Sequence, residues 1–293
     1  YRATEFMVEN GLPAYLEWRD DLSWYPHGRD VSATSQVMLH TTAATFYQIF
    51  GMGSSLYDFA IWFPVVIGSL STVVIFAIVR TIGGTTAGLF ASLFFAISPI
   101  LIIRGSIGWF KSEPLGLFYG LLAVYLIISA IKSDKGIVSV GKIVGGGILL
   151  GLGLASWGGT QFFVIPIGFF FLALPFMRKD NKFIIWASTL FTSTFLMMTL
   201  VFGRTGLQVP ESCGLCFGFI STISGFFLIG CTVILVVCVM IKNLNKNQLR
   251  YGVALLGGAV ITGIAIVSSG AITVPTFRYL NAANPFLITT DVL

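Results

Sequence analysis

The sequence is poor in charge. Only 10% of its 293 residues are Asp, Glu, Lys or Arg, whereas soluble globular domains carry about 25%. Hydrophobic residues make up 56% of the chain, and from Leu56 onward they form long runs broken by short polar segments. Apolar runs of about 20 residues are typical of membrane-spanning helices. The composition excludes a soluble globular protein and predicts an all-α polytopic membrane protein.

Ionisable residues are also absent from the interior of the predicted spans, where an ion-coupled transporter needs them. No ionisable residue lies deep inside a predicted span, although such transporters use intramembrane ionisable groups. The formal net charge is +5. This sign does not indicate nucleic acid, because membrane proteins gather basic residues in cytoplasmic loops. We expect no nucleic-acid partner.

Cysteine and histidine are few and poorly spaced for a metal site. Cys213 and Cys216 form a single CxxC, and without a second pair or histidines this is weak evidence for zinc. A disulfide and a plain packing role both stay open. His27 and His40 are 13 residues apart and match no ligand spacing. No Ser-His-Asp or Cys-His arrangement is supported.

The apolar runs predict eight spans. Residues 38–51 are apolar but about 14 residues long, too short to cross a bilayer, so we expect an interfacial helix there. Residues 4–10 predict a short helix that ends at Gly11, and residues 24–30 predict an ordered loop. The predicted spans are 56–79, 84–103, 114–131, 143–157, 160–177, 183–203, 216–241 and 251–269.

Loop charges give the orientation. If the connections after residues 79, 131, 177 and 241 are cytoplasmic, that side holds ten basic and two acidic residues. The other side then holds seven basic and ten acidic residues. The positive-inside rule favours this arrangement. It predicts a multi-pass membrane protein whose N-terminal segment and residues 104–113 share the outer face. We expect the membrane to be the plasma membrane and this face to be extracellular.

Residues 104–114 (RGSIGWFKSEP) are the most polar gap between two spans. Glu113 has two readings: a carboxylate favoured by the start of the next helix, or a ligand for a hard divalent cation. Arg104 has two as well: an arginine that reaches the interface from the end of a span, or a contact to a phosphate or carboxylate. Asp58, at the start of a span, is best explained as a cap.

Several stretches together resemble the catalytic subunit of oligosaccharyltransferase in its archaeal form. Residues 104–113 resemble the family's second acidic motif, an Arg followed by Gly, two bulky residues and acid-x-acid. The order and spacing of the stretches make the joint match specific. The stretches are 1–6 (YRATEF), 24–30 (WYPHGRD), 39–41 (LHT), 104–113 (RGSIGWFKSE), 156–159 (SWGG) and 284–286 (NPF).

The resemblance implies a GT-C glycosyltransferase fold in a membrane. Such an enzyme moves an oligosaccharide from a polyprenyl (dolichyl) phosphate carrier in the membrane lipid to the Asn of an Asn-x-Ser/Thr sequon in an acceptor polypeptide. It uses Mn²⁺ or Mg²⁺ held by carboxylates, and the archaeal form implies a single subunit. Carried onto this chain, Glu113 is a catalytic residue and metal ligand, Arg104 is catalytic and substrate-binding, and Trp109 and Lys111 bind substrate.

Lys111 departs from the resembled motif, because it stands where the first acid of acid-x-acid belongs. We interpret residues 1–55 as an external loop with interfacial helices, 56–269 as the transmembrane domain and 270–293 as the start of a late external loop. The soluble C-terminal domain is expected to lie outside this sequence, and an isolated fragment is expected to be inactive. Two alternatives stay open: another GT-C enzyme such as a mannosyltransferase, with Asp20 and Asp21 as its acidic pair, or a degenerate, non-enzymatic relative.

Overall fold

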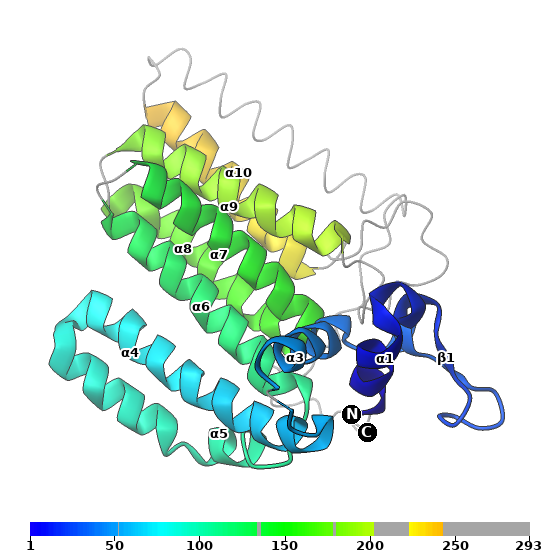
Figure 1. Ribbon diagram of the computed structural model, residues 1–293. Coiled ribbons are helices and arrows are strands. Elements are labelled where there is room, and N and C mark those ends of the chain that lie inside the picture. Colours follow the sequence, from blue (N-terminus) through cyan, green and yellow to red (C-terminus); the bar gives the residue numbers. More distant parts are fainter. Residues whose placement is uncertain (52, 134–135, 178–179, 202–222, 243–293) are drawn as a thin grey trace, which may run out of the picture.

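The computed structural model is a bundle of antiparallel helices with a small, mostly helical unit at one end (Figure 1). It describes residues 1–51, 53–133, 136–177, 180–201 and 223–242. Within these ranges, five helices are long and apolar enough to cross a membrane. The predicted class, an all-α polytopic membrane protein, is confirmed.

Helix α4 (Leu56–Ala96) is a helical hairpin and supplies the first two predicted spans. Its 41 residues are interrupted at Gly84, whose backbone has φ 85° and ψ 178°. The chain reverses there, so that the two arms run side by side (Figure 1). A Cβ at Gly88, on the second arm, would lie 3.0 Å from the carbonyl oxygen of Phe76 on the first. Small residues permit this close approach of helices in lipid.

The predicted second span, 84–103, is wrong at its outer end. The second arm of α4 ends at Ala96, and a separate short helix, α5 (Pro99–Arg104), follows. Pro99 stands in the first turn of α5, where its missing amide hydrogen is not needed, and proline disfavours helical conformation in the residue before it. Ser98, directly before it, is accordingly extended, with φ −64° and ψ 123°.

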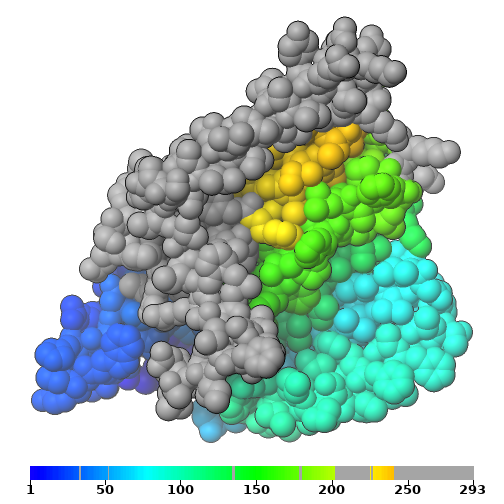
Figure 2. Space-filling view, turned by 180° about the vertical axis from the view of Figure 1, so that it is seen from behind, coloured from blue at the N-terminus to red at the C-terminus, as the bar shows by residue number. Residues whose placement is uncertain are grey.

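The remaining helices form the main bundle: α6 (Ser112–Lys132), α7 (Gly136–Ser156), the 3₁₀ helix η1 (Gly158–Phe163) with α8 (Val164–Met177), α9 (Asn181–Val201) and α10 (Ile223–Lys242). Seen from behind, α4 and α5 form one edge of the molecule, and α9 and α10 lie toward the opposite edge (Figure 2). The largest core cluster joins α6 to α10 through residues such as Leu150, Phe171, Phe191 and Leu228.

Most predicted spans coincide with these helices, although their ends differ. Helix α7 begins seven residues before the predicted start of 143. Residues 157–159 make a turn, with Trp157 extended between α7 and η1. The predicted span 251–269 and the early part of 216–241 lie outside the described residues, and the total of eight spans stays a prediction.

The N-terminal unit comprises α1 (Arg2–Glu17), the antiparallel strands β1 (Arg19–Asp20) and β2 (Arg29–Asp30), α2 (Val31–Thr34) and α3 (Val37–Phe50). The predicted 14-residue helix at 38–51 is confirmed as α3. The predicted end of the first helix at Gly11 is confirmed, because Gly11 takes the non-helical φ 80° and ψ 170°. A second helical segment that was not predicted continues from there to Glu17, so that α1 is kinked at Gly11.

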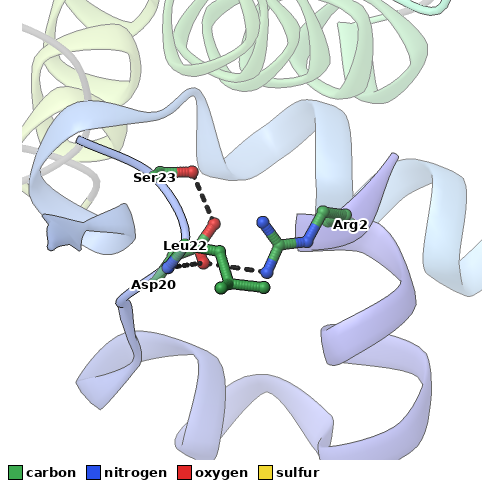
Figure 3. A network of polar contacts seen from close by, with 4 residues as sticks. All are labelled: Arg2, Asp20, Leu22 and Ser23. Carbon is green, nitrogen blue, oxygen red and sulfur yellow. Dashed lines mark hydrogen bonds and ion pairs between the residues drawn. The ribbon is translucent and has the colours of Figure 1, made fainter. Parts of the chain in front are cut away.

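A buried carboxylate ties the β1–β2 hairpin to α1. Asp20 Oδ1 accepts hydrogen bonds from Arg2 Nη2 at 2.9 Å and from the Leu22 amide at 3.1 Å, and Oδ2 accepts one from Ser23 Oγ at 2.6 Å (Figure 3). The Ser23 hydroxyl, the Leu22 amide and the Arg2 charge together lower the pKa of Asp20, with Ser23 the largest cause. Charge-assisted hydrogen bonds of this kind are strong and fix where the hairpin leaves the helix.

A second buried contact joins α1 to α3. The Tyr15 hydroxyl lies 2.8 Å from His40 Nδ1, and both side chains are buried. Burial lowers the pKa of His40 to about 3, and the charge of Arg29 acts in the same direction. His40 is therefore a neutral partner in a packed core, as expected for a satisfied polar residue.

Gly84 supports a prediction about the α4 hairpin. Its φ and ψ are essentially reserved for glycine, and a side chain there costs about 1–3 kcal/mol. Nothing lies within 4 Å of a Cβ at this position, so the cost is one of backbone conformation alone. We expect Gly84→Ala to lower the free energy of unfolding by that amount in SDS titrations of the purified protein. Gly141→Ala, at a helical and open position in α7, should be neutral or slightly stabilising. Equal loss in both variants would contradict this account.

His40 supports a second prediction, on pH. The pKa is lowered in the folded state, so between pH 6.5 and about 3 the unfolded chain binds a proton that the folded chain does not. Stability should therefore fall as the pH drops below about 6.5, with a slope of up to about 1.4 kcal/mol per pH unit. In unfolding titrations from pH 8 to 5, His40→Gln should have a shallower slope. Tyr15→Phe, which leaves His40 buried, should lose stability at every pH and keep the slope.

Candidate functional site

Two helix ends meet at the site. Arg104 is the last residue of α5 and Glu113 is the second residue of α6. Arg104 Nη1 donates to Glu113 Oε1 at 3.1 Å, and the two side chains are 48% and 23% exposed. Such a partly exposed ion pair stabilises a fold by about 0–1 kcal/mol. Its main structural effect is to hold the two ends of the 104–113 segment together.

The loop between them is fixed to the first arm of α4. The amide of Gly108 donates to the carbonyl oxygen of Ile61 at 3.0 Å. Gly108 has φ 80°, a conformation that glycine adopts without strain. The Phe110 ring packs edge-on against Phe63, with centroids 5.5 Å apart. These contacts set the positions of the two residues beside Phe110, Trp109 and Lys111.

Two cations lie against the ring of Trp109. The ammonium of Lys111 lies 4.5 Å and the guanidinium carbon of Arg104 lies 5.4 Å from the centroid of its ring. Cations are attracted to the face of an indole at such distances. Lys111 forms no ion pair with any described residue. The structure therefore unites all four residues that the resemblance named: Arg104, Trp109, Lys111 and Glu113.

Two polar atoms of this cluster are buried without a partner among the described residues. They are Glu113 Oε2 and Trp109 Nε1. Leaving a buried polar group unpaired costs about 1–3 kcal/mol, so such atoms are uncommon in packed cores. One is an acceptor and the other a donor. A ligand able to pair with either would recover that energy.

Arg104 and Glu113 also line a large cavity next to the loop. It measures about 1150 Å³. The hydroxyls of Ser69, Ser71 and Thr72 in its wall donate to carbonyls of their own helix, so that the wall is largely apolar. A cavity of this size can take part of an amphiphilic molecule. Its lining comes from both arms of α4, the 97–108 region, α6 and Trp157: Val65, Gly68, Ser69, Ser71, Thr72, Phe95, Ala96, Ile100, Leu101, Ile102, Arg104, Gly105, Ser106, Ile107, Glu113, Pro114, Leu117 and Trp157.

Trp157 reaches this cavity because α6 and α7 cross at two glycines. A Cβ at Gly116 would lie 3.4 Å from the Gly153 carbonyl oxygen, and a Cβ at Gly153 would lie 3.4 Å from the Gly116 carbonyl oxygen. Thr160 Oγ1 lies 2.9 Å from the Gly153 oxygen and 3.3 Å from the Gly116 oxygen. Sequence reasoning used Trp157 only as a family landmark. A tryptophan followed by two glycines between spans was the available signal.

A divalent cation finds one candidate ligand here. Glu113 Oε2 is a buried, unpaired carboxylate oxygen, which is the donor type that Mg²⁺ and Mn²⁺ prefer. Among the described residues no three His, Cys, Asp or Glu side chains lie together as a metal site would require. Glu113 fits a cation as one ligand, and any others would come from beyond the described residues.

Other sequence-based candidates take structural roles or lie elsewhere. Asp58 belongs to a cap, as predicted: Ser55 Oγ accepts from the Asp58 amide at 3.0 Å and donates to its carboxylate at 2.7 Å. Asp20, half of the acidic pair of the mannosyltransferase alternative, is occupied by Arg2, Leu22 and Ser23. Cys213 and Cys216 lie outside the described residues.

Comparison with known proteins agrees with the fold. Residues 1–286 match the model of the family described as "Oligosaccharyl transferase STT3, N-terminal". The chain is 27% identical over 211 residues to the dolichyl-diphosphooligosaccharide–protein glycosyltransferase subunit stt-3 of Caenorhabditis elegans. That match covers 69% of this chain and 27% of the relative, so that this chain spans well under a third of the relative's length.

Two solved structures of the Archaeoglobus fulgidus oligosaccharyltransferase are similar in fold. One, AglB in complex with an inhibitory peptide and a dolichol-phosphate, aligns with a TM-score of 0.69 at 20% identity, over 97% of this chain and 35% of that one. The other, a complex with Zn and sulfate, aligns with a TM-score of 0.67 at 18% identity, over 97% and 37%. At these identities the likeness shows the fold alone.

The α6–α7 crossing supports a prediction. A Cβ on Gly116 would come within 2.4 Å of the Trp157 Cβ and 2.9 Å of Thr160 Oγ1. Overpacking of this kind costs about 1–3 kcal/mol. We expect Gly116→Ala to lower the unfolding free energy by that amount and to displace Trp157, which changes its fluorescence. Gly136→Ala, where nothing lies within 4 Å of the added Cβ, should do neither. A stable Gly116→Ala variant with unchanged fluorescence would contradict the crossing described here.

Proposed function

The chain belongs to the oligosaccharyl transferase STT3 N-terminal family, and from this membership we propose that the natural protein is a glycosyltransferase of protein N-glycosylation. It transfers an oligosaccharide from a polyprenyl (dolichyl) phosphate or diphosphate carrier to the Asn of an Asn-x-Ser/Thr sequon. The family match over residues 1–286 carries the proposal. The names of the curated relatives and the peptide and dolichol-phosphate bound to AglB support it.

We propose roles for four residues at the α5–α6 junction. Glu113 is catalytic and supplies one oxygen ligand, Oε2, to Mn²⁺ or Mg²⁺, which when bound neutralises charge that develops on the phosphate leaving group. Arg104 is catalytic and orients Glu113 through the 3.1 Å ion pair. Arg104, Trp109 and Lys111 contact substrate. The unpaired Glu113 Oε2 and the cations stacked on Trp109 support these assignments.

We also propose the cellular setting. The site faces outward, as the distribution of basic residues favours, and the membrane is the plasma membrane, a proposal that rests on the likeness to archaeal AglB. The α3 helix is hydrogen-bonded to α6 through Thr42 and Tyr119 at 3.1 Å, which puts the N-terminal unit at the same end as residues 104–113 (Figure 1). The partners are lipid-linked donor, acceptor polypeptide and surrounding lipid. Single-subunit operation rests on the likeness to archaeal AglB, whereas the C. elegans relative is named as a subunit.

Replacement of one carboxylate tests the function. In the full-length natural protein we expect Glu113→Gln to reduce glycopeptide formation by about 100-fold or more, the range seen when one group that stabilises transition-state charge is removed, as with an oxyanion-hole donor, about 10²–10³ in rate. Transfer of labelled glycan from lipid-linked donor to an Asn-x-Thr peptide is measured with Mn²⁺ present.

Glu17→Gln is the matched control, because Glu17 is an exposed carboxylate at the end of α1 and should keep full activity. The unfolding midpoint of Glu113→Gln should stay close to wild type, as a partly exposed ion pair contributes about 0–1 kcal/mol. A folded Glu113→Gln variant with normal transfer would contradict the catalytic role of Glu113. If the wild type transfers glycan from no lipid-linked donor, the proposed oligosaccharide-transfer function is wrong.

A further inference from the structure

The α5–α6 junction has an excess of positive charge and of hydrogen-bond donors. Residues 104–114 contain two cations and one carboxylate. The carboxylate, Glu113, is paired with Arg104. Lys111 is left without an ionic partner among the described residues, so that the cluster has a net charge of +1.

The donors of this cluster are largely unused. Arg104 has five N–H donors, and its one side-chain hydrogen bond to the described residues is that from Nη1 to Glu113. The Lys111 ammonium has three donors and makes no hydrogen bond to the described residues. Trp109 Nε1 is buried and unpaired. A group rich in acceptors and negative charge is the chemical complement of this set.

Lys111 is also held away from Glu113. Its ammonium lies 4.5 Å from the centre of the Trp109 ring, and it comes no closer than 4.0 Å to a Glu113 oxygen. When an ammonium group lies over an indole ring, those of its N–H bonds that point away from the ring can still donate to an acceptor. The adjacent amides at the start of α6 add to the positive potential there. Both cations thus lie against the same aromatic ring, and the carboxylate pairs with Arg104 and not with Lys111.

We propose that Arg104 and Lys111, held over Trp109, bind a phosphate or diphosphate group directly, so that this edge of the site takes its positive charge from the chain and not from a divalent cation. The proposal rests on the proposed function for the identity of the natural ligand, a lipid-linked phosphate. It goes further in assigning ground-state phosphate binding to Lys111, which stands where the resembled motif has an acid. Arginine and lysine are both common phosphate ligands in proteins.

The test is phosphate binding without metal. Full-length natural protein in phosphatidylcholine nanodiscs, with EDTA present, is titrated with inorganic pyrophosphate by calorimetry. We expect binding by the wild type and an affinity about tenfold or more lower in Lys111→Met, as a charge-assisted hydrogen bond is worth at least that factor. Lys111→Arg should bind within a few-fold of wild type. A second arm adds polyprenyl phosphate to the nanodisc, where it should compete with pyrophosphate.

Lys182→Met is the matched control. Lys182 is an exposed lysine in the first turn of α9, at the opposite end of the bundle from the start of α6, and its replacement should leave pyrophosphate binding unchanged. Equal binding by wild type and Lys111→Met, or binding that requires added Mn²⁺ or Mg²⁺, would overturn the proposal. If polyprenyl phosphate does not compete with pyrophosphate, the proposal that the natural ligand is a lipid-linked phosphate is wrong.

The outcome separates this inference from the proposed function. A wild type that binds pyrophosphate through Lys111 but transfers no oligosaccharide refutes the enzyme function and leaves the anion site standing. A wild type that transfers oligosaccharide while Lys111→Met binds pyrophosphate normally refutes the anion site alone.

Discussion

A bilayer offers the backbone no water to hydrogen-bond with, and this constraint shapes the whole chain. Within the membrane each amide and carbonyl must be paired inside its own helix, so departures from regular helix gather at the ends of spans. The reversal at Gly84, the break before Pro99 and the extended residue Trp157 are all such departures. The cluster of Arg104, Trp109, Lys111 and Glu113 lies at one of them, where side chains can be polar because the backbone has already left the apolar layer.

Packing of apolar side chains then decides where the polar residues point. The loop between α5 and α6 is anchored to α4 by the Gly108–Ile61 hydrogen bond and the Phe110–Phe63 contact. Trp109, adjacent to Phe110, becomes a fixed platform for two cations. On the other side, the α6–α7 crossing at Gly116 brings Trp157 to the cavity that Glu113 lines. The polar site is thus positioned by aromatic and glycine contacts that carry no charge.

The two ion pairs among the described residues have different roles. The Arg104–Glu113 pair is partly exposed and adds little stability, yet it leaves one buried carboxylate oxygen without a partner among the described residues. By contrast, both oxygens of Asp20 accept hydrogen bonds, from Arg2, Leu22 and Ser23. This contact stabilises the N-terminal unit. Glu113 Oε2 and Trp109 Nε1 are both at the α5–α6 junction and both lack a partner among the described residues, which makes this junction the place where a ligand would be expected.

The sequence by itself determined the membrane class, the approximate position of most helices and the polar stretch in which Arg104, Lys111 and Glu113 lie. Long apolar runs, scarce charge and the polar gap at residues 104–114 suffice for this, because hydrophobicity and span length are local properties. The helical segment after Gly11 was not predicted, and the second arm of α4 ends at Ala96, before the predicted end at residue 103. Glycine and proline signals say that regular helix changes there, but not whether it stops, bends or resumes.

Only the tertiary structure decided which polar atoms have partners. Lys111 and Glu113 are two residues apart, yet the first stacks on Trp109 and the second pairs with Arg104, nine residues away. The burial of His40 against Tyr15 and the entry of Trp157 into the cavity likewise depend on helices distant in sequence. Hydrogen bonding and burial depend on how segments pack against one another, and a linear pattern of residues does not contain that information.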